Sequence, residues 1–181
     1  MQQSARGGAP LSCFVRELFS FPAFLAAILV AGACIASSWQ NVILGKILTE
    51  GDVWWHLATG QNILATRAFP VLDPYSYTAA GTTWIAYGWL PELLIAVSVR
   101  LHGTQGLALL LLLTVSAFYL LLYYYGWLRC RNAKAAAIAC AAVMPITGAF
   151  VSPRPQFFAA ILFVLVLICI EHFRQGKQNA L

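Results

Sequence analysis

Four carboxylates between residues 49 and 103 stand beside long apolar runs, where acidic side chains are candidates for chemistry. They are Glu50, Asp52, Asp73 and Glu92. A charged group next to lipid is costly, so carboxylates at a membrane face are functional candidates by default. Asp52 ranks first, because it follows a glycine at the end of an apolar run. A carboxylate there can act as a general base on a hydroxyl bound at the membrane surface.

His56 lies four residues after Asp52, a spacing that places both side chains on one face of a helix. From there the imidazole can hold or tune the Asp52 carboxylate. Structural roles stay open beside these, with Asp52 as a helix N-cap and His56 as an interfacial aromatic residue. A turn is sufficient to explain Asp73, and compensation of a helix dipole is sufficient for Glu92.

Arg154 is the cationic candidate, since it lies between two prolines where two apolar runs meet. A guanidinium near the bilayer surface suits a lipid phosphate or pyrophosphate. Ion pairing with Glu50 or Asp52 is an equally good structural interpretation. No Gly-rich phosphate loop, catalytic-triad spacing or metal-ligand spacing appears in the sequence, so we predict no metal site.

The composition excludes most soluble classes of protein. Of 181 residues, 61% are hydrophobic and 9% are charged, whereas a soluble domain carries about 25% charged residues. An ordinary cytosolic globule, a disordered chain and a disulfide-rich secreted module are therefore excluded. The formal charge of +5 comes from basic residues between apolar runs. That pattern is typical of membrane topology and does not indicate a nucleic-acid partner.

Four apolar stretches are long enough to cross a hydrocarbon core, which takes about 20 residues. They cover residues 21–44, 107–127, 135–151 and 157–170. We therefore predict an all-α, polytopic membrane domain with four transmembrane helices over residues 19–174. Cytoplasmic tails are predicted at residues 1–18 and 175–181, and membrane lipids are the expected surroundings of the domain.

The distribution of basic residues predicts that both termini face the cytoplasm. Seven of them fall on that side: Arg6, Arg16, Arg129, Arg131, Lys134, Arg174 and Lys177. The other four are Lys46, Arg67, Arg100 and Arg154. An excess of Lys and Arg marks cytoplasmic loops, so residues 49–103 become a long outer loop.

The outer loop is predicted to carry two interfacial helices, over residues 52–66 and 89–101. The first has one apolar stripe, formed by Val53, Leu57, Gly60 and Leu64. Its tandem tryptophans, at residues 54–55, suit the headgroup level, and a stacking platform is the alternative. The second helix is too short to span the membrane. A Pro- and Asp-rich turn between the helices predicts a small hairpin.

Residues 50–60 read EGDVWWHLATG, a block that resembles the first outer loop of bacterial multi-pass proteins of the C-type (GT-C) glycosyltransferase superfamily. Further matching positions are Pro70, the DPYSY turn at residues 73–77, the WLPE helix start at residues 89–92 and the Arg-Pro pair at residues 154–155. The resemblance extends over roughly residues 19–172. The Asp-x-Trp-Trp-His block is its most specific part.

The resemblance implies an outward-facing active site in a bacterial inner (plasma) membrane. It implies a polyprenyl-phosphate sugar as the donor, and we predict no other cofactor. Asp52 would match the usual catalytic base of the superfamily, which deprotonates an acceptor hydroxyl while the lipid phosphate leaves, with inversion at the sugar. The two interfacial helices would match those that family members carry between their first two spans. A phosphate contact by Arg154 is inferred from its position alone.

The chain departs from the superfamily in its number of spans, since family enzymes have many more than four. We therefore expect it to be incomplete as an enzyme, either as a truncated product or as the N-terminal part of one. The alternative is a non-catalytic accessory subunit of a larger membrane assembly, with other membrane proteins as partners. A small-residue face at residues 135–142 suits such helix packing.

Overall fold

The computed structural model describes residues 19–43, 45–148 and 150–176. In chain order the helices are α2 (Phe21–Ser38), the π-helical turn η1 (Trp39–Ile43), α3 (Lys46–Thr49), α4 (Gly51–Thr66), α5 (Trp89–His102), α6 (Gln105–Cys130), α7 (Ala133–Gly148) and α8 (Pro155–Arg174). The all-α prediction is confirmed. The predicted tail at residues 1–18 and residues 177–181 of the other tail lie outside the described residues.

Within the described residues, three helices are long and apolar enough to cross a membrane: Phe21–Asn41, Gln105–Cys130 and Pro155–Arg174. They correspond to the first, second and fourth predicted spans. The third predicted span is α7, an apolar helix of 16 residues. It is shorter than predicted because the helix ends at Gly148, and Val151 belongs to the connection before α8.

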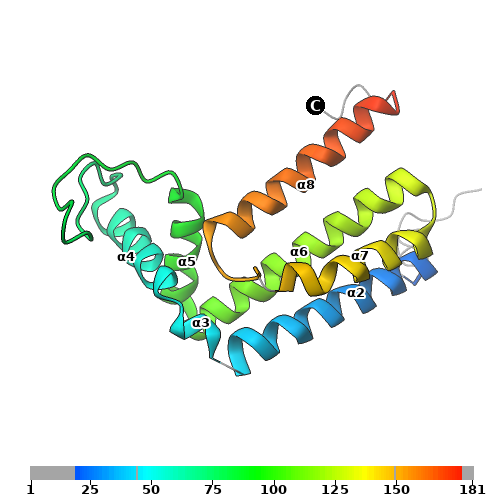
Figure 1. Ribbon diagram of the computed structural model, residues 1–181, viewed down its shortest axis with the longest axis horizontal. Coiled ribbons are helices and arrows are strands. Elements are labelled where there is room, and N and C mark those ends of the chain that lie inside the picture. The colour runs from blue at the N-terminus through cyan, green and yellow to red at the C-terminus, as the bar shows by residue number, and fades with distance from the viewer. Residues whose placement is uncertain (1–18, 44, 149, 177–181) are drawn as a thin grey trace, which may run out of the picture.

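Helix α6 is the centre of the arrangement, since α2, α5, α7 and α8 all pack against it. Figure 1 shows α2, α6 and α7 side by side, with α4 and α5 gathered at one end. The start of α2, the α6–α7 turn and the end of α8 lie at the other end (Figure 1). There Lys134 Nζ lies 5.7 Å from the centre of the Phe21 ring, and the Tyr123 hydroxyl donates to the Pro22 carbonyl oxygen over 3.1 Å.

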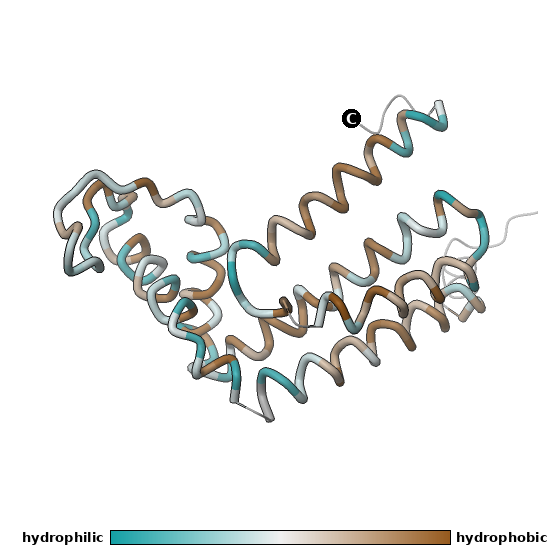
Figure 2. The backbone as a smooth tube through the Cα atoms, viewed as in Figure 1, coloured by the Kyte–Doolittle hydropathy of each residue, from teal (hydrophilic) through white to brown (hydrophobic). Residues whose placement is uncertain are grey.

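Polar and apolar residues are segregated along the bundle. Figure 2 shows hydrophobic residues along α6 and α8, and hydrophilic ones at the α6–α7 turn and at the end of α8. The basic residues Arg129, Arg131, Lys134 and Arg174 belong to that end, whereas Glu50 and Asp52 begin α4 at the opposite end. Charged side chains are thus found at both ends of the bundle, with the apolar helices between them.

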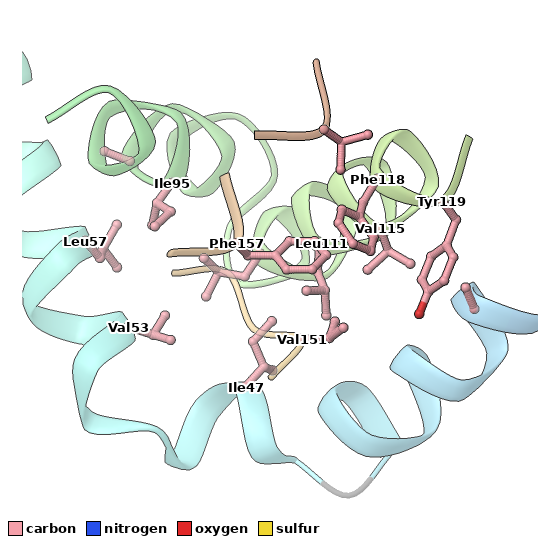
Figure 3. Close-up of a cluster of buried hydrophobic side chains, with 14 of the residues drawn as sticks. Ile47, Val53, Leu57, Ile95, Leu111, Val115, Phe118, Tyr119, Val151 and Phe157 are labelled. Carbon is pink, nitrogen blue, oxygen red and sulfur yellow. The ribbon is translucent and has the colours of Figure 1, made fainter. Parts of the chain in front are cut away.

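The larger buried cluster joins α4 and α5 to α6 and to the start of α8, as Figure 3 shows. Val53 and Leu57 of α4 are buried in it together with Ile95 of α5, Leu111 of α6 and Phe157 of α8. The first two belong to the apolar stripe that suggested an interfacial helix. Because α5 covers this stripe, it faces the protein core and not lipid.

Two glycines let neighbouring helices approach to backbone contact. A Cβ atom at Gly60 of α4 would lie 2.0 Å from the Glu92 carbonyl oxygen of α5. A Cβ atom at Gly106 of α6 would lie 2.0 Å from the Ser98 carbonyl oxygen of α5. A larger residue would force the backbones apart. Close contact therefore fixes α4 on α5 and α5 on α6, and so positions the side chains at the start of α4.

Candidate functional site

The start of α4 holds two carboxylates of the candidate site. Glu50 has an extended backbone (φ −76°, ψ 112°) at the N-cap position, and its side chain makes no capping hydrogen bond. Asp52 lies in the first turn of α4, where the helix dipole stabilises a negative charge. The N-cap alternative for Asp52 is therefore wrong, because Glu50 occupies that position.

Arg154 bridges both carboxylates with one guanidinium group. Its Nη1 lies 3.1 Å from Asp52 Oδ2, while its Nε and Nη2 each lie 3.1 Å from Glu50 Oε2. Arg154 occupies the N-cap position of α8, directly before Pro155. The start of α8 is thus tied to the start of α4, and the ion pairing that the sequence left open is present with both partners.

Ser152 and Lys46 complete the surroundings of Glu50. The Ser152 hydroxyl donates to Glu50 Oε2 over 2.6 Å, and Lys46 Nζ lies 3.7 Å from Glu50 Oε1. Ser152 was not predicted, because a serine two residues before an arginine has no distinctive pattern. The role of Lys46 was not predicted either, although its spacing of four residues from Glu50 is a recognisable signal for an ion pair.

The ion-pair site borders a polar pocket of about 220 Å³, lined by Glu50, Phe150, Ser152, Arg154, Gln156 and Phe157. The Glu50 side chain is 13% exposed and the Asp52 side chain is 53% exposed. Glu50 is therefore a fixed anchor for the guanidinium, whereas Asp52 is accessible from outside. Within the described residues, no three His, Cys, Asp or Glu side chains are grouped as metal ligands.

An apolar groove adjoins this polar pocket, between the start of α5 and the start of α8. It has a volume of about 380 Å³ and is lined by Tyr87, Gly88, Trp89, Leu90, Pro91, Pro155, Gln156, Phe158, Ala159 and Leu162. Gln156 lines both the groove and the polar pocket. A charged site and an apolar surface therefore meet at one side chain.

His56 pairs with Glu92, whereas its spacing in the sequence had suggested Asp52 as the partner. His56 Nδ1 lies 3.0 Å from Glu92 Oε1, and both side chains are almost fully buried. Asp52 is exposed at the helix start, whereas His56 lies on the face of α4 that α5 covers. Glu92 does lie in the first turn of α5, but its contact with the imidazole is what accounts for its burial.

The two adjacent tryptophans have different surroundings. The Trp54 side chain is exposed, and its Nε1 donates to the Leu48 carbonyl oxygen over 3.0 Å. The Trp55 ring lies against His56, with ring centroids 3.7 Å apart, and meets Trp84 edge-on at 6.2 Å. Trp55 therefore belongs to an aromatic cluster, whereas Trp54 faces outward.

Asp73 makes its contacts within the loop between α4 and α5. Its Oδ1 accepts hydrogen bonds from the N–H groups of Tyr75, over 2.8 Å, and Ser76, over 3.0 Å, so the predicted turn is confirmed. Hydrogen bonds from the Ser76 side chain and from the two backbone N–H groups hold the pKa of Asp73 below its ordinary value of 3.8. Leu72 and Thr83 form an isolated antiparallel bridge, a minimal form of the predicted hairpin.

A charge cluster at the opposite end of α6 and α8 was not predicted. Glu171 is buried, and its carboxylate lies 3.0 Å from Arg129 Nη1 and 2.7 Å from Arg174 Nη2. Gln175 Nε2 donates to the same carboxylate over 2.8 Å. Because Arg129 belongs to α6 and Glu171 to α8, this cluster ties the two helices together far from the carboxylates at the start of α4.

Similarity to known proteins adds nothing to this geometry. The chain matches no protein-family model, no curated protein and no solved structure. The candidate site is therefore defined by its own contacts, in which Glu50, bound by the Ser152 hydroxyl, holds Arg154 beside the accessible Asp52.

Proposed function

We propose that the chain is a glycosyltransferase-like integral membrane protein that binds a polyprenyl-phosphate sugar at the outer face of a membrane. The observation that carries the proposal is the position of Arg154, which contacts Asp52 beside a polar pocket. That pocket adjoins an apolar groove at Gln156. A lipid phosphate has matching parts, because its headgroup is anionic and its chain is apolar. Arginine is well suited to bidentate contact with phosphate.

Asp52 acts as the general base in this proposal. An exposed ion pair contributes about 0–1 kcal/mol, so the donor phosphate can replace Asp52 at Arg154. The released carboxylate takes the proton of an acceptor hydroxyl as the hydroxyl oxygen attacks the anomeric carbon. The bond from that carbon to the phosphate oxygen breaks with inversion, and Arg154 stabilises the charge on the leaving phosphate. Glu50 keeps Arg154 in place through its own ion pair.

We also propose that α7 is a fourth span and that both termini lie in the cytoplasm of a bacterial inner membrane. α7 is about 24 Å long at a rise of about 1.5 Å per residue, and local thinning of a core of about 30 Å accommodates such a helix. Two observations support a crossing. α7 packs along both α2 and α6, and the turn before it carries Arg131, with Arg129 and Lys134 beside it. α4 and α5 would then lie at the outer interface.

The phosphate site is tested by lipid binding to the full chain in detergent micelles. Native mass spectrometry compares a polyprenyl monophosphate with phosphatidylglycerol. We expect the wild-type chain to prefer the polyprenyl phosphate and Arg154→Gln to lose that preference. Arg100→Gln is the matched control, since Arg100 is an exposed arginine near the end of α5 that lines neither the polar pocket nor the groove. Equal binding of the two lipids by the wild-type chain would exclude a site selective for polyprenyl phosphate.

The role of Asp52 is tested by transfer of label from polyprenyl-phosphate hexoses to acceptors in a membrane extract, with the chain in liposomes. Loss of a general base lowers rates by about 10²–10⁴-fold, so we expect Asp52→Asn to reduce transfer to that extent. Binding of the polyprenyl phosphate should persist in this variant. Undiminished transfer by Asp52→Asn would exclude Asp52 as the base.

An accessory subunit is the second candidate function, and the exposed side of α7 favours it. Ala135, Ile138, Ala139, Ala142 and Ile146 are all exposed and recur at helical spacing. Small residues let helices approach closely inside a membrane. If this surface holds a partner, Ala139→Leu will release a second membrane protein that otherwise co-purifies with the chain. Asp52→Asn would then leave the activity of the assembly unchanged.

A further inference from the structure

A second pocket lies on the loop between α4 and α5, apart from the residues assigned to lipid phosphate. It has a volume of about 400 Å³ and is lined by Trp55, Asp73, Tyr75, Ser76 and Trp84. None of these residues lines the polar pocket at Arg154 or the apolar groove. We propose that this aromatic pocket binds a pyranose ring of a saccharide. The proposal goes beyond sugar transfer, because binding here does not depend on Asp52.

Three aromatic rings give the pocket its walls, with Trp84 in contact with the other two. The Trp84 and Tyr75 rings have centroids 5.8 Å apart with planes at 82°, and the Trp84 and Trp55 rings have centroids 6.2 Å apart with planes at 66°. These edge-to-face contacts fix the rings at steep angles to one another. The face of an aromatic ring is electronegative, so it attracts the polarised C–H groups that cover one side of a pyranose.

Asp73 supplies the polar partner that a sugar hydroxyl needs. Its Oδ1 is oriented by two backbone N–H groups, and hydrogen bonding keeps its pKa low, so the group is an ionised carboxylate at neutral pH. An ionised carboxylate has about four acceptor positions and no donor. Three positions are used, by the N–H groups of Tyr75 and Ser76 and by the Ser76 side chain, and the remaining capacity can accept an O–H group from a ligand. Aromatic walls with one fixed polar group are typical of small-molecule sites.

Anchoring in lipid headgroups is the competing role for these aromatic residues. Tyr77 has the geometry of an anchor, since it is 100% exposed, whereas Tyr75 is 40% exposed. Trp55 and Trp84 are half-buried and lie in edge-to-face contact with each other beside the pocket. Rings that contact one another and line an open, carboxylate-bearing hollow are placed to hold a ligand and are poorly placed to reach outward into a bilayer.

The test is saturation-transfer-difference NMR on the full chain in lipid nanodiscs prepared without sugar-based detergent. The probes are the methyl pyranosides of glucose, galactose, mannose and N-acetylglucosamine. We expect at least one probe to receive saturation from the protein. Tyr75→Ala should weaken binding about tenfold, which corresponds to the loss of one stacking contact. Tyr77→Ala is the matched control from the same loop and should bind like the wild-type chain.

Two further variants distinguish loss of sugar binding from loss of fold and from loss of sugar transfer. Trp84→Phe retains an aromatic ring and should bind more weakly without loss of fold, while Asp52→Asn should bind as the wild-type chain does, even if sugar transfer is abolished. Absence of saturation for every probe would overturn the proposal and assign these rings to headgroup anchoring. Equal weakening by Tyr75→Ala and Tyr77→Ala would overturn it as well.

The saccharide can be free or can be the headgroup of a glycolipid, since both present the same pyranose ring. Nanodiscs with and without a monohexosyl diacylglycerol separate the two sources. Suppression of the probe signal by the glycolipid indicates a lipid-borne sugar. An unchanged signal indicates a soluble saccharide, and both results require an occupied aromatic pocket.

Discussion

His56 Nδ1 lies 3.0 Å from Glu92 Oε1, and this contact joins two helices across 36 residues of sequence. The pair is almost completely removed from solvent, and Glu92 Oε2 has no hydrogen-bond partner among the described residues. The Trp55 ring closes over the imidazole at a centroid distance of 3.7 Å. The pair thus links the aromatic pocket to the α4–α5 contact, and it holds the helix that presents Asp52.

Breaking this buried pair should destabilise the protein strongly. Removal of one partner from a buried hydrogen bond costs about 1–3 kcal/mol, because the other polar group is left unsatisfied. We expect His56→Ala and Glu92→Ala each to lower the free energy of unfolding by about that amount. The double variant should lose less than the sum, with a coupling of about 0.5–3 kcal/mol. Denaturant titration of the purified chain measures all three.

His102→Ala is the control for this cycle, since His102 is exposed at the end of α5. Exposed substitutions of this kind change stability by less than about 0.5 kcal/mol. Strict additivity of His56→Ala and Glu92→Ala would contradict the importance of their contact.

The close approach of α4 and α5 at Gly60 leads to a second prediction about stability. Gly60→Ala adds a methyl group where the Glu92 carbonyl oxygen leaves no room, and overpacking of this kind costs about 1–3 kcal/mol. Gly51→Ala is the matched control at the start of the same helix, because a Cβ atom there has no neighbour within 4 Å. Thermal unfolding should show a lower midpoint for Gly60→Ala alone. Equal midpoints would show that the helices separate without cost.

The boundaries of α4 and α5 were predictable from sequence to within about one residue, because local signals set them. Asp52 favours a first turn, and Pro91 is tolerated near a helix start. The burial of the α4 stripe could not be predicted in the same way. An apolar stripe looks the same whether lipid or another helix covers it, and here Gly60 brings α5 close enough to cover it.

The partners of the charged residues were the least predictable part of the site. Helical spacing suggested Asp52 for His56, but the true partner, Glu92, is brought in by a contact distant in sequence. For Arg154 the sequence offered a phosphate or an acidic partner, since position alone does not exclude a carboxylate. The ion pairs with Glu50 and Asp52 depend on how α8 begins beside α4.

The turn at Asp73 should respond to acid in a defined direction. Its hydrogen bonds place the folded pKa below the ordinary value of 3.8, so the carboxylate stabilises the turn fully above that value. The contribution is lost as the pH falls through the lower folded pKa. Amide NMR shifts of Tyr75 and Ser76 report this transition directly. Asp73→Asn should abolish it, and a midpoint at or above 3.8 would contradict the hydrogen bonding.

The proposed crossing of α7 determines on which side the connection to α8 lies. Phe150, which follows α7, is 77% exposed, and Cys130, at the end of α6, is exposed as well. In a chain otherwise free of cysteine, a membrane-impermeant maleimide should label Phe150→Cys on intact cells. It should label the native Cys130 only after the membrane is opened. Tyr77→Cys, in the loop between α4 and α5 that is proposed to face outward, is the control that should react on intact cells. If Phe150→Cys and Cys130 react from the same side, α7 does not cross, and the assignment of the Arg154–Asp52 site to the outer face fails.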